Sequence, residues 1–168
     1  MTDTPTTNTY ASVVSRELVR IALTLAALND LEVKTANIEN SYLTAPITEQ
    51  IWTKLGPEFG SDAGKLAIIV RLLYGLKSAG APFRNHLADC MQHLGWTSCI
   101  ADRDVWYKAE TRPEDGHKYY AYALLYVDDV LMAHQNALTA LRDIDKFFKM
   151  KEGSIGTLTT ILARSCAK

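Results

Sequence analysis

Two adjacent aspartates, Asp128 and Asp129, lie in the middle of an apolar run that extends from Tyr119 to Ala133. The apolar segments on both sides have the composition of β-strands, so the fold must accommodate two carboxylates between them. Removing an ionised carboxylate from water is costly, more so beside a like charge, unless a cation compensates it. Aspartate is common in tight turns, and a carboxylate pair is also typical of a Mg²⁺ site. The pattern alone favours neither interpretation.

The 168 residues are 48% hydrophobic, which is enough for a sizeable core and predicts a single domain over residues 1–168. The net charge of −1 does not point to a nucleic-acid-binding protein, but the charge is distributed unevenly. No Asp or Glu occurs between Ala63 and Ala88, and the candidate phosphate contacts in this acid-free window are Lys65, Arg71, Lys77 and Arg84.

The cysteines, Cys90, Cys99 and Cys166, are odd in number and follow no spacing pattern, which predicts free thiols in a reducing compartment. No segment approaches the about 18 consecutive apolar residues of a membrane span. The polar start from Met1 to Pro5 does not resemble a signal peptide. The expectation is therefore an intracellular protein that does not contact a membrane.

Residue periodicity predicts an alternation of helices and strands along the chain. Helical spacing of apolar residues predicts helices over 12–29, 82–95 and 137–150. Strand patterns occur over 31–38, 49–55, 66–70, 104–109, 118–127 and 130–133. The run at 66–70 is predicted to be a buried strand, and the glycines and proline of 56–64 predict a loop. These elements predict an α+β fold with a mainly antiparallel sheet packed on helices.

Several motifs occur in a characteristic order. Tyr126-Val-Asp-Asp129 matches the Y-x-D-D box of reverse transcriptases, and Leu73-Tyr-Gly-Leu-Lys77 matches an L-Y-G-L-K element. Supporting matches are Ser41-Tyr-Leu-Thr-Ala-Pro46, Gly56-Pro-Glu-Phe-Gly60 and Ala101-Asp-Arg-Asp-Val-Trp106. From about Tyr10 to Gly156 the chain therefore resembles the reverse transcriptase domain of copia-type LTR retrotransposons.

This resemblance implies an RNA-directed DNA polymerase palm with part of the fingers, and Mg²⁺ as the cofactor. A hairpin would present Asp128 and Asp129, and a neighbouring strand would present a third carboxylate. The implied partners are an RNA or DNA template-primer and dNTP, with integrase and RNase H as neighbours in an intact polyprotein in the cytoplasm. Lys77 would contact the triphosphate or the template, and Tyr42 would block a ribose 2′-hydroxyl.

The chain departs from the family at the third carboxylate. The family's first motif reads D-[VI]-x-x-[AS]-[FY]-L, and the matching stretch is Asn37-Ile-Glu-Asn-Ser-Tyr-Leu43. A register that begins at Glu32 is rejected because it loses the Tyr-Leu-Thr-Ala-Pro match. Asn37 offers one neutral oxygen, so the metal is expected to be held weakly and catalysis to be impaired. Substitution by Glu32 or Glu39 is less favoured; strand rise alone separates Glu39 from Asn37 by about 6–7 Å.

The two ends also depart from the family pattern. The family's basic fingers segment begins upstream of Met1, and its Tyr-Leu-Gly turn does not follow Gly156. These departures predict a truncated, degenerate copy that is catalytically inactive. One alternative is a non-catalytic nucleic-acid-binding or structural remnant that uses residues 65–84. Another is a Mg²⁺-dependent phosphohydrolase or receiver-like domain, but the short connection at the aspartates disfavours the parallel sheet it needs.

Overall fold

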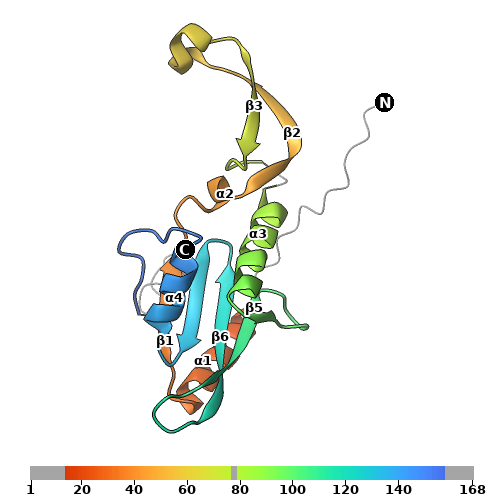
Figure 1. Ribbon diagram of the computed structural model, residues 1–168. Helices are drawn as coiled ribbons and strands as arrows, with labels where there is room; N and C mark the ends of the chain where they lie inside the picture. Colours follow the sequence, from red (N-terminus) through yellow and green to blue (C-terminus); the bar gives the residue numbers. More distant parts are fainter. Residues whose placement is uncertain (1–13, 77–78, 158–168) are drawn as a thin grey trace. The chain divides into compact units, whose positions relative to one another are not determined.

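The computed structural model describes residues 14–76 and 79–157. The described residues form two compact units, one of residues 40–76 and 79–86 and a larger one of residues 14–39 and 87–157. Figure 1 shows a mixture of helices and strands, and every strand pairing in these ranges is antiparallel. The predicted α+β class is confirmed, and the parallel sheet of a receiver-like domain is excluded for the described residues.

The larger unit is built on a five-stranded sheet in the order β1-β7-β6-β5-β4. The strands are β1 (Glu32–Asn37), β4 (Thr97–Ser98), β5 (Val105–Thr111), β6 (Lys118–Tyr126) and β7 (Asp129–His134). In the register of the sheet, Asp129 lies opposite Tyr126 on one side and opposite Asn37 on the other. The sheet therefore brings the Asp pair and Asn37 together from distant parts of the sequence, as the motif alignment predicted.

Helices cover both faces of this sheet. Helix α1 (Arg16–Leu28) begins where Ser15 Oγ accepts a hydrogen bond from the Leu18 N–H, 3.3 Å away. It packs against the face that carries Leu124 and Leu131. Because side chains alternate along a strand, Val130 and the fully buried Met132 lie on the opposite face, against which α4 (Ala137–Asp145) packs.

Helix α3 (Gly80–His93) contributes to both units, and its last turns bury Leu87 and Met91 in the larger one. It ends in a Schellman-type turn in which the Trp96 N–H donates to the Met91 carbonyl, 2.9 Å away. Gly95 supplies the positive φ of 82° that this turn requires. The helix predicted over 82–95 is thus confirmed at nearly its expected length.

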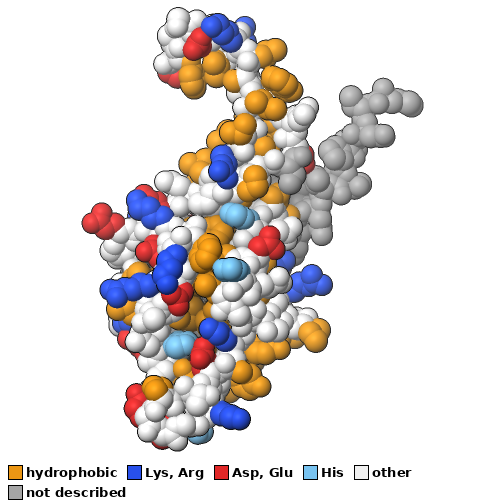
Figure 2. Space-filling model, viewed as in Figure 1, with side chains coloured by type: hydrophobic (Ala, Val, Ile, Leu, Met, Phe, Trp, Pro, Cys, Tyr) orange, Lys and Arg blue, Asp and Glu red, His pale blue; other side chains and the backbone are white. Residues whose placement is uncertain are grey.

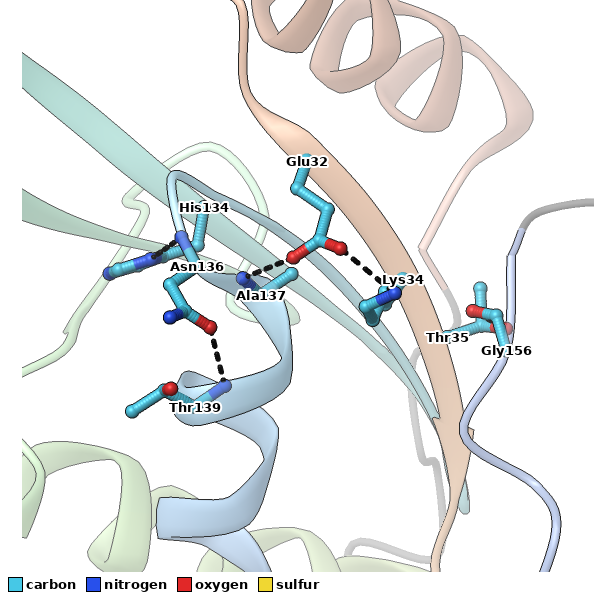
Figure 3. A network of polar contacts seen from close by, with 8 residues as sticks. All are labelled: Glu32, Lys34, Thr35, His134, Asn136, Ala137, Thr139 and Gly156. Atoms are coloured by element: carbon cyan, nitrogen blue, oxygen red, sulfur yellow. Dashed lines mark hydrogen bonds and ion pairs between the residues drawn. The ribbon is translucent and has the colours of Figure 1, made fainter.

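The N-terminus of α4 is fixed by polar contacts, shown in Figure 3. Asn136 Oδ1 accepts from the Thr139 N–H at 3.0 Å, and Glu32 Oε2 accepts from the Ala137 N–H at 3.0 Å. Glu32 also pairs with Lys34 at 2.8 Å. Both interactions favour the charged carboxylate and lower the pKa of Glu32, the hydrogen bond from Lys34 being the larger cause. The Glu32 carboxylate therefore caps the start of α4.

The predicted helix over 137–150 is too long, because α4 ends at Asp145. Asp145 Oδ1 accepts a hydrogen bond from the Met150 N–H at 2.6 Å, which favours a turn over continued helix. Met150 then forms an antiparallel bridge with Ile38. This early end frees residues 149–156 to run beside β1.

The smaller unit contains α2 (Ser41–Thr44), β2 (Pro46–Lys54), η1 (Pro57–Asp62) and β3 (Leu66–Arg71). Strands β2 and β3 form a two-stranded hairpin. The prediction that 66–70 is a buried strand is wrong in its burial: Leu66 is 71% exposed and Val70 is 67% exposed. A two-stranded ribbon covers neither of its own faces, so an apolar run here does not imply a core position. The segment predicted as a loop, 56–64, contains the short 3₁₀ helix η1.

Within the described residues, no helix combines the length and the apolar composition needed to span a membrane.

Candidate active site at the Asp128–Asp129 turn

The Asp pair lies at a tight β-hairpin turn. Strands β6 and β7 pair as far as Tyr126 and Asp129, so only Val127 and Asp128 form the connection. Val127 has a φ of +55°, a conformation that is strained for a β-branched residue. Both aspartates are partly exposed at this turn. The turn interpretation and the site interpretation of the sequence are thus compatible, because the turn is what presents the carboxylates.

Asn37 bridges the two carboxylates from the neighbouring strand. Its Nδ2 lies 2.9 Å from Asp128 Oδ2 and 3.0 Å from Asp129 Oδ1, so one amide group donates a hydrogen bond to each aspartate. Asn37 and Asp129 are directly opposite in the register, and the Ile38 N–H donates to the Asp128 carbonyl at 2.7 Å. We refer to Asn37, Asp128 and Asp129 as the amide–carboxylate cluster.

The chemistry of an amide determines what this cluster can hold. The Nδ2 group has two hydrogens, and each is directed to one carboxylate, which partly compensates the repulsion between the two negative charges. With the amide reversed, its oxygen would face two carboxylate oxygens, all of them acceptors. The amide nitrogen therefore lies within hydrogen-bonding distance of both carboxylates.

The surrounding acidic residues do not supply the missing carboxylate. Glu39 Oε2 pairs with Lys149 Nζ at 2.7 Å, and Glu32 caps α4 at the other end of β1. The described residues contain no group of three or more His, Cys, Asp or Glu side chains that could hold a metal ion. Two carboxylates bridged by an amide donor do not fit a two-metal site, which needs shared carboxylate oxygens around both ions.

The other predicted site residues within the described ranges belong to the smaller unit: Tyr42, Lys65, Arg71 and Arg84. Tyr42 lies in α2, where its ring contacts Tyr74 and Phe83 edge-on, with ring centroids 4.9 and 5.6 Å apart. These contacts fix the orientation of the Tyr42 ring within its own unit. Its expected role near the sugar of a nucleotide remains a prediction.

Two basic residues of the acid-free window have partners within the smaller unit. Lys65 pairs with Asp62, just outside the window, and Arg71 Nη1 donates to the Thr44 carbonyl at 2.9 Å. Arg84 lies on α3, and Lys77 lies outside the described residues. On the face shown in Figure 2, Lys and Arg side chains are interspersed with Asp and Glu. Contact between these residues and phosphates remains a prediction.

Two features of the site had no strong signal in the sequence. Ser154 contacts the main chain of Asn37, with 3.1 Å between Ser154 Oγ and the Asn37 N. A lone serine in a glycine-containing segment has no distinctive pattern. The strained φ of Val127 is equally hidden, because valine is typical of the strand interior rather than of a turn.

The free thiols predicted from the sequence are confirmed for Cys90 and Cys99, and Cys166 lies outside the described residues. Burial raises the pKa of the Cys90 thiol to about 11.

Comparison with known proteins gives consistent matches over this region. A family model described as reverse transcriptase (RNA-dependent DNA polymerase) matches residues 2–162. The retrovirus-related Pol polyprotein from transposon TNT 1-94 of Nicotiana tabacum is 29% identical over 149 residues, covering 85% of this chain and 11% of the relative. Those from transposons RE2 and RE1 of Arabidopsis thaliana are 23% and 24% identical, covering 86% and 74% of this chain and 10% and 8% of the relatives. The chain thus spans about a tenth of the length of these relatives.

Proposed function

This chain belongs to the reverse transcriptase (RNA-dependent DNA polymerase) family, of the copia type expected from its motifs, and we propose that it is a polymerase domain whose metal site is impaired. In this proposal the larger unit corresponds to the palm and the smaller unit to part of the fingers. The substrate class is a template-primer together with dNTP, in the context of a Pol polyprotein.

The hydrogen bonds from Asn37 Nδ2 to Asp128 and Asp129 carry this proposal, at 2.9 and 3.0 Å. In two-metal nucleotidyl transfer, Mg²⁺ ions held by carboxylates would activate the attacking hydroxyl and stabilise the triphosphate charge. Here an amide donor takes the place of the charge that would attract the ions. Removing one preorganised electrostatic group from an active site costs about 3–4 kcal/mol, or a factor of about 10²–10³ in rate.

The Asp pair, Tyr42 and the basic residues have proposed roles that do not require a bound metal ion. Asp128 and Asp129 stay in place because the Asn37 amide neutralises part of their repulsion. Tyr42 is proposed to discriminate against a ribose 2′-hydroxyl. Lys65, Arg71, Lys77 and Arg84 are proposed to contact the phosphates of the nucleotide or the template-primer, which requires positive charge but no bound ion.

Calorimetric titration with Mn²⁺ or Mg²⁺ tests the proposal. We expect the unaltered chain to bind either ion weakly and the Asn37→Asp variant to bind clearly more tightly. The matched control is the double variant Asn37→Asp/Asp128→Asn, which has as many carboxylates as the unaltered chain and should bind weakly again. Equal affinity in the unaltered chain and Asn37→Asp would contradict the proposal, as would extension of oligo(dT) on poly(rA) by the unaltered chain.

A further inference from the structure

Residues 149–156 run along the outer edge of β1, which is the edge strand of the sheet. Thr35 exchanges two main-chain hydrogen bonds with Gly156, at 2.9 and 3.0 Å, and the Glu39 N–H donates to the Lys149 carbonyl at 2.8 Å. Residues 35, 37 and 39 therefore direct their main-chain groups away from β7. The N–H and carbonyl of Asn37 depend on this outer segment for their partners.

Opposite Asn37 the outer segment pairs only in part: the Lys151 N–H donates to the Asn37 carbonyl at 2.8 Å, whereas the Asn37 N–H has a side-chain partner. It bends in a turn in which the Ser154 N–H donates to the Lys151 carbonyl at 3.0 Å and Gly153 adopts a φ of +67°. The Ser154 N–H is therefore already used. The Ser154 hydroxyl accepts from the Asn37 N–H at 3.1 Å, as a strand carbonyl would, and it also donates to the Asn37 carbonyl oxygen at 3.3 Å, which the Lys151 N–H contacts as well.

We propose that Ser154 is a positioning residue for the amide–carboxylate cluster. Its hydroxyl takes the place of the missing strand carbonyl at the Asn37 N–H and, together with the Lys151 N–H on the Asn37 carbonyl, sets the direction in which the side chain of residue 37 leaves the strand. Asn37 and Asp129 form a pair without mutual main-chain hydrogen bonds, in which opposing side chains approach closely. A small rotation of the Asn37 main chain would thus move its Nδ2 away from the carboxylates.

The first experiment uses the unaltered Asn37 and requires no metal. In ¹⁵N NMR spectra, Ser154→Ala should shift the side-chain NH₂ resonances of Asn37 and speed the hydrogen exchange of its main-chain N–H. Ser154→Thr, which keeps the hydroxyl, should restore both. The matched control is Thr35→Val, because Thr35 Oγ1 contacts the Gly156 carbonyl of the same segment at 3.4 Å but does not touch Asn37. Thr35 and Gly156 are labelled in Figure 3.

The second experiment rests on the proposed function and measures Mn²⁺ affinity in the Asn37→Asp background. Residues that orient a metal ligand typically change affinity by about 10–100-fold. We expect Ser154→Ala to lower the Mn²⁺ affinity about tenfold, within this range, and Thr35→Val to leave it unchanged. If Asn37→Asp binds no Mn²⁺, the proposed function fails, while the NMR experiment still decides the role of Ser154.

Two results would overturn the role of Ser154. One is a Ser154→Ala protein with unchanged Asn37 side-chain resonances. The other is an equal effect of Ser154→Ala and Thr35→Val, which would mean that Ser154 only anchors the outer segment. If Ser154→Ala does not fold, Ser154→Cys keeps a side chain of similar size with a much weaker hydrogen-bonding group, and the same comparison applies.

Discussion

Asn37→Asp should destabilise the chain in the absence of metal, although it restores the residue that the family carries. The substitution replaces the amide donor with a third carboxylate, so the contacts at 2.9 and 3.0 Å become contacts between like charges. Each lost hydrogen bond to a charged group is worth about 1.5–3 kcal/mol when buried, and less here because the aspartates are partly exposed.

Protonation sets an upper limit to this cost. The cluster can avoid a third negative charge by protonating one carboxyl, and at about pH 7 this costs about 4 kcal/mol for a group with an ordinary pKa near 3.9. We therefore expect Asn37→Asp to lower the free energy of unfolding by about 2–4 kcal/mol at neutral pH. Nearby negative charges raise the folded-state pKa of the new carboxyl, so the loss should grow as pH rises through that pKa and shrink toward about pH 4.

Urea unfolding in EDTA, followed by the fluorescence of the buried Trp96 and Trp106, measures this loss. Asn37→Leu is the control, since it removes the donor without adding a charge and should lose less than Asn37→Asp at neutral pH. Mn²⁺ at about 100 times its Kd should return about 2.7 kcal/mol to Asn37→Asp. An Asn37→Asp variant as stable in EDTA as the unaltered chain would refute the reasoning.

Three further predictions concern other residues. Val127→Gly should raise the free energy of unfolding by about 0.5–1 kcal/mol, because glycine relieves the strained φ of +55°. Val127→Ala keeps the strain and should not raise it. Equal urea midpoints for Val127→Gly and the unaltered chain would contradict this prediction. Burial lowers the pKa of His134, whose Nδ1 accepts from the Asn136 N–H at 2.8 Å. The contribution of neutral His134 to the free energy of unfolding should therefore be fully present above the ordinary titration range of histidine and should decline as pH falls through that range. His134→Gln should remove this pH dependence of urea unfolding; an unchanged slope would assign it to other groups. Template-primer binding should weaken steeply with salt and disappear in Lys77→Glu/Arg84→Glu, and binding that survives the double change would exclude this surface.

The parts of the fold that follow from local pattern were predictable from the sequence. The pairing of the Asn37 strand with the Asp129 strand joins distant residues, and it was expected from the family resemblance of the two motifs rather than from local pattern. The amphipathic spacing of α1 and the glycine after α3 determine these helices locally. For these two helices a short stretch of sequence contains the physical cause.

The features that were missed depend on contacts between distant residues. The apolar strand at Leu66 is exposed because its neighbours form only a two-stranded ribbon, a property of the assembled fold. The early end of α4 depends on Asp145 accepting the Met150 N–H, and the role of Ser154 depends on a residue 117 positions away. The direction of the Asn37 amide could not be read from sequence either, because it follows from the positions of both carboxylates.

Paramagnetic broadening by Mn²⁺ tests most directly whether the Asn37 amide takes the place of a cation. The signals to follow are the main-chain amides of Asp128 and Asp129 and, in the unaltered chain, the side-chain NH₂ of Asn37. The account predicts strong selective broadening at these positions in Asn37→Asp and clearly weaker broadening in the unaltered chain at the same Mn²⁺ concentration. Selective broadening of equal extent in the unaltered chain would show that a metal binds there despite the amide, and would contradict the account.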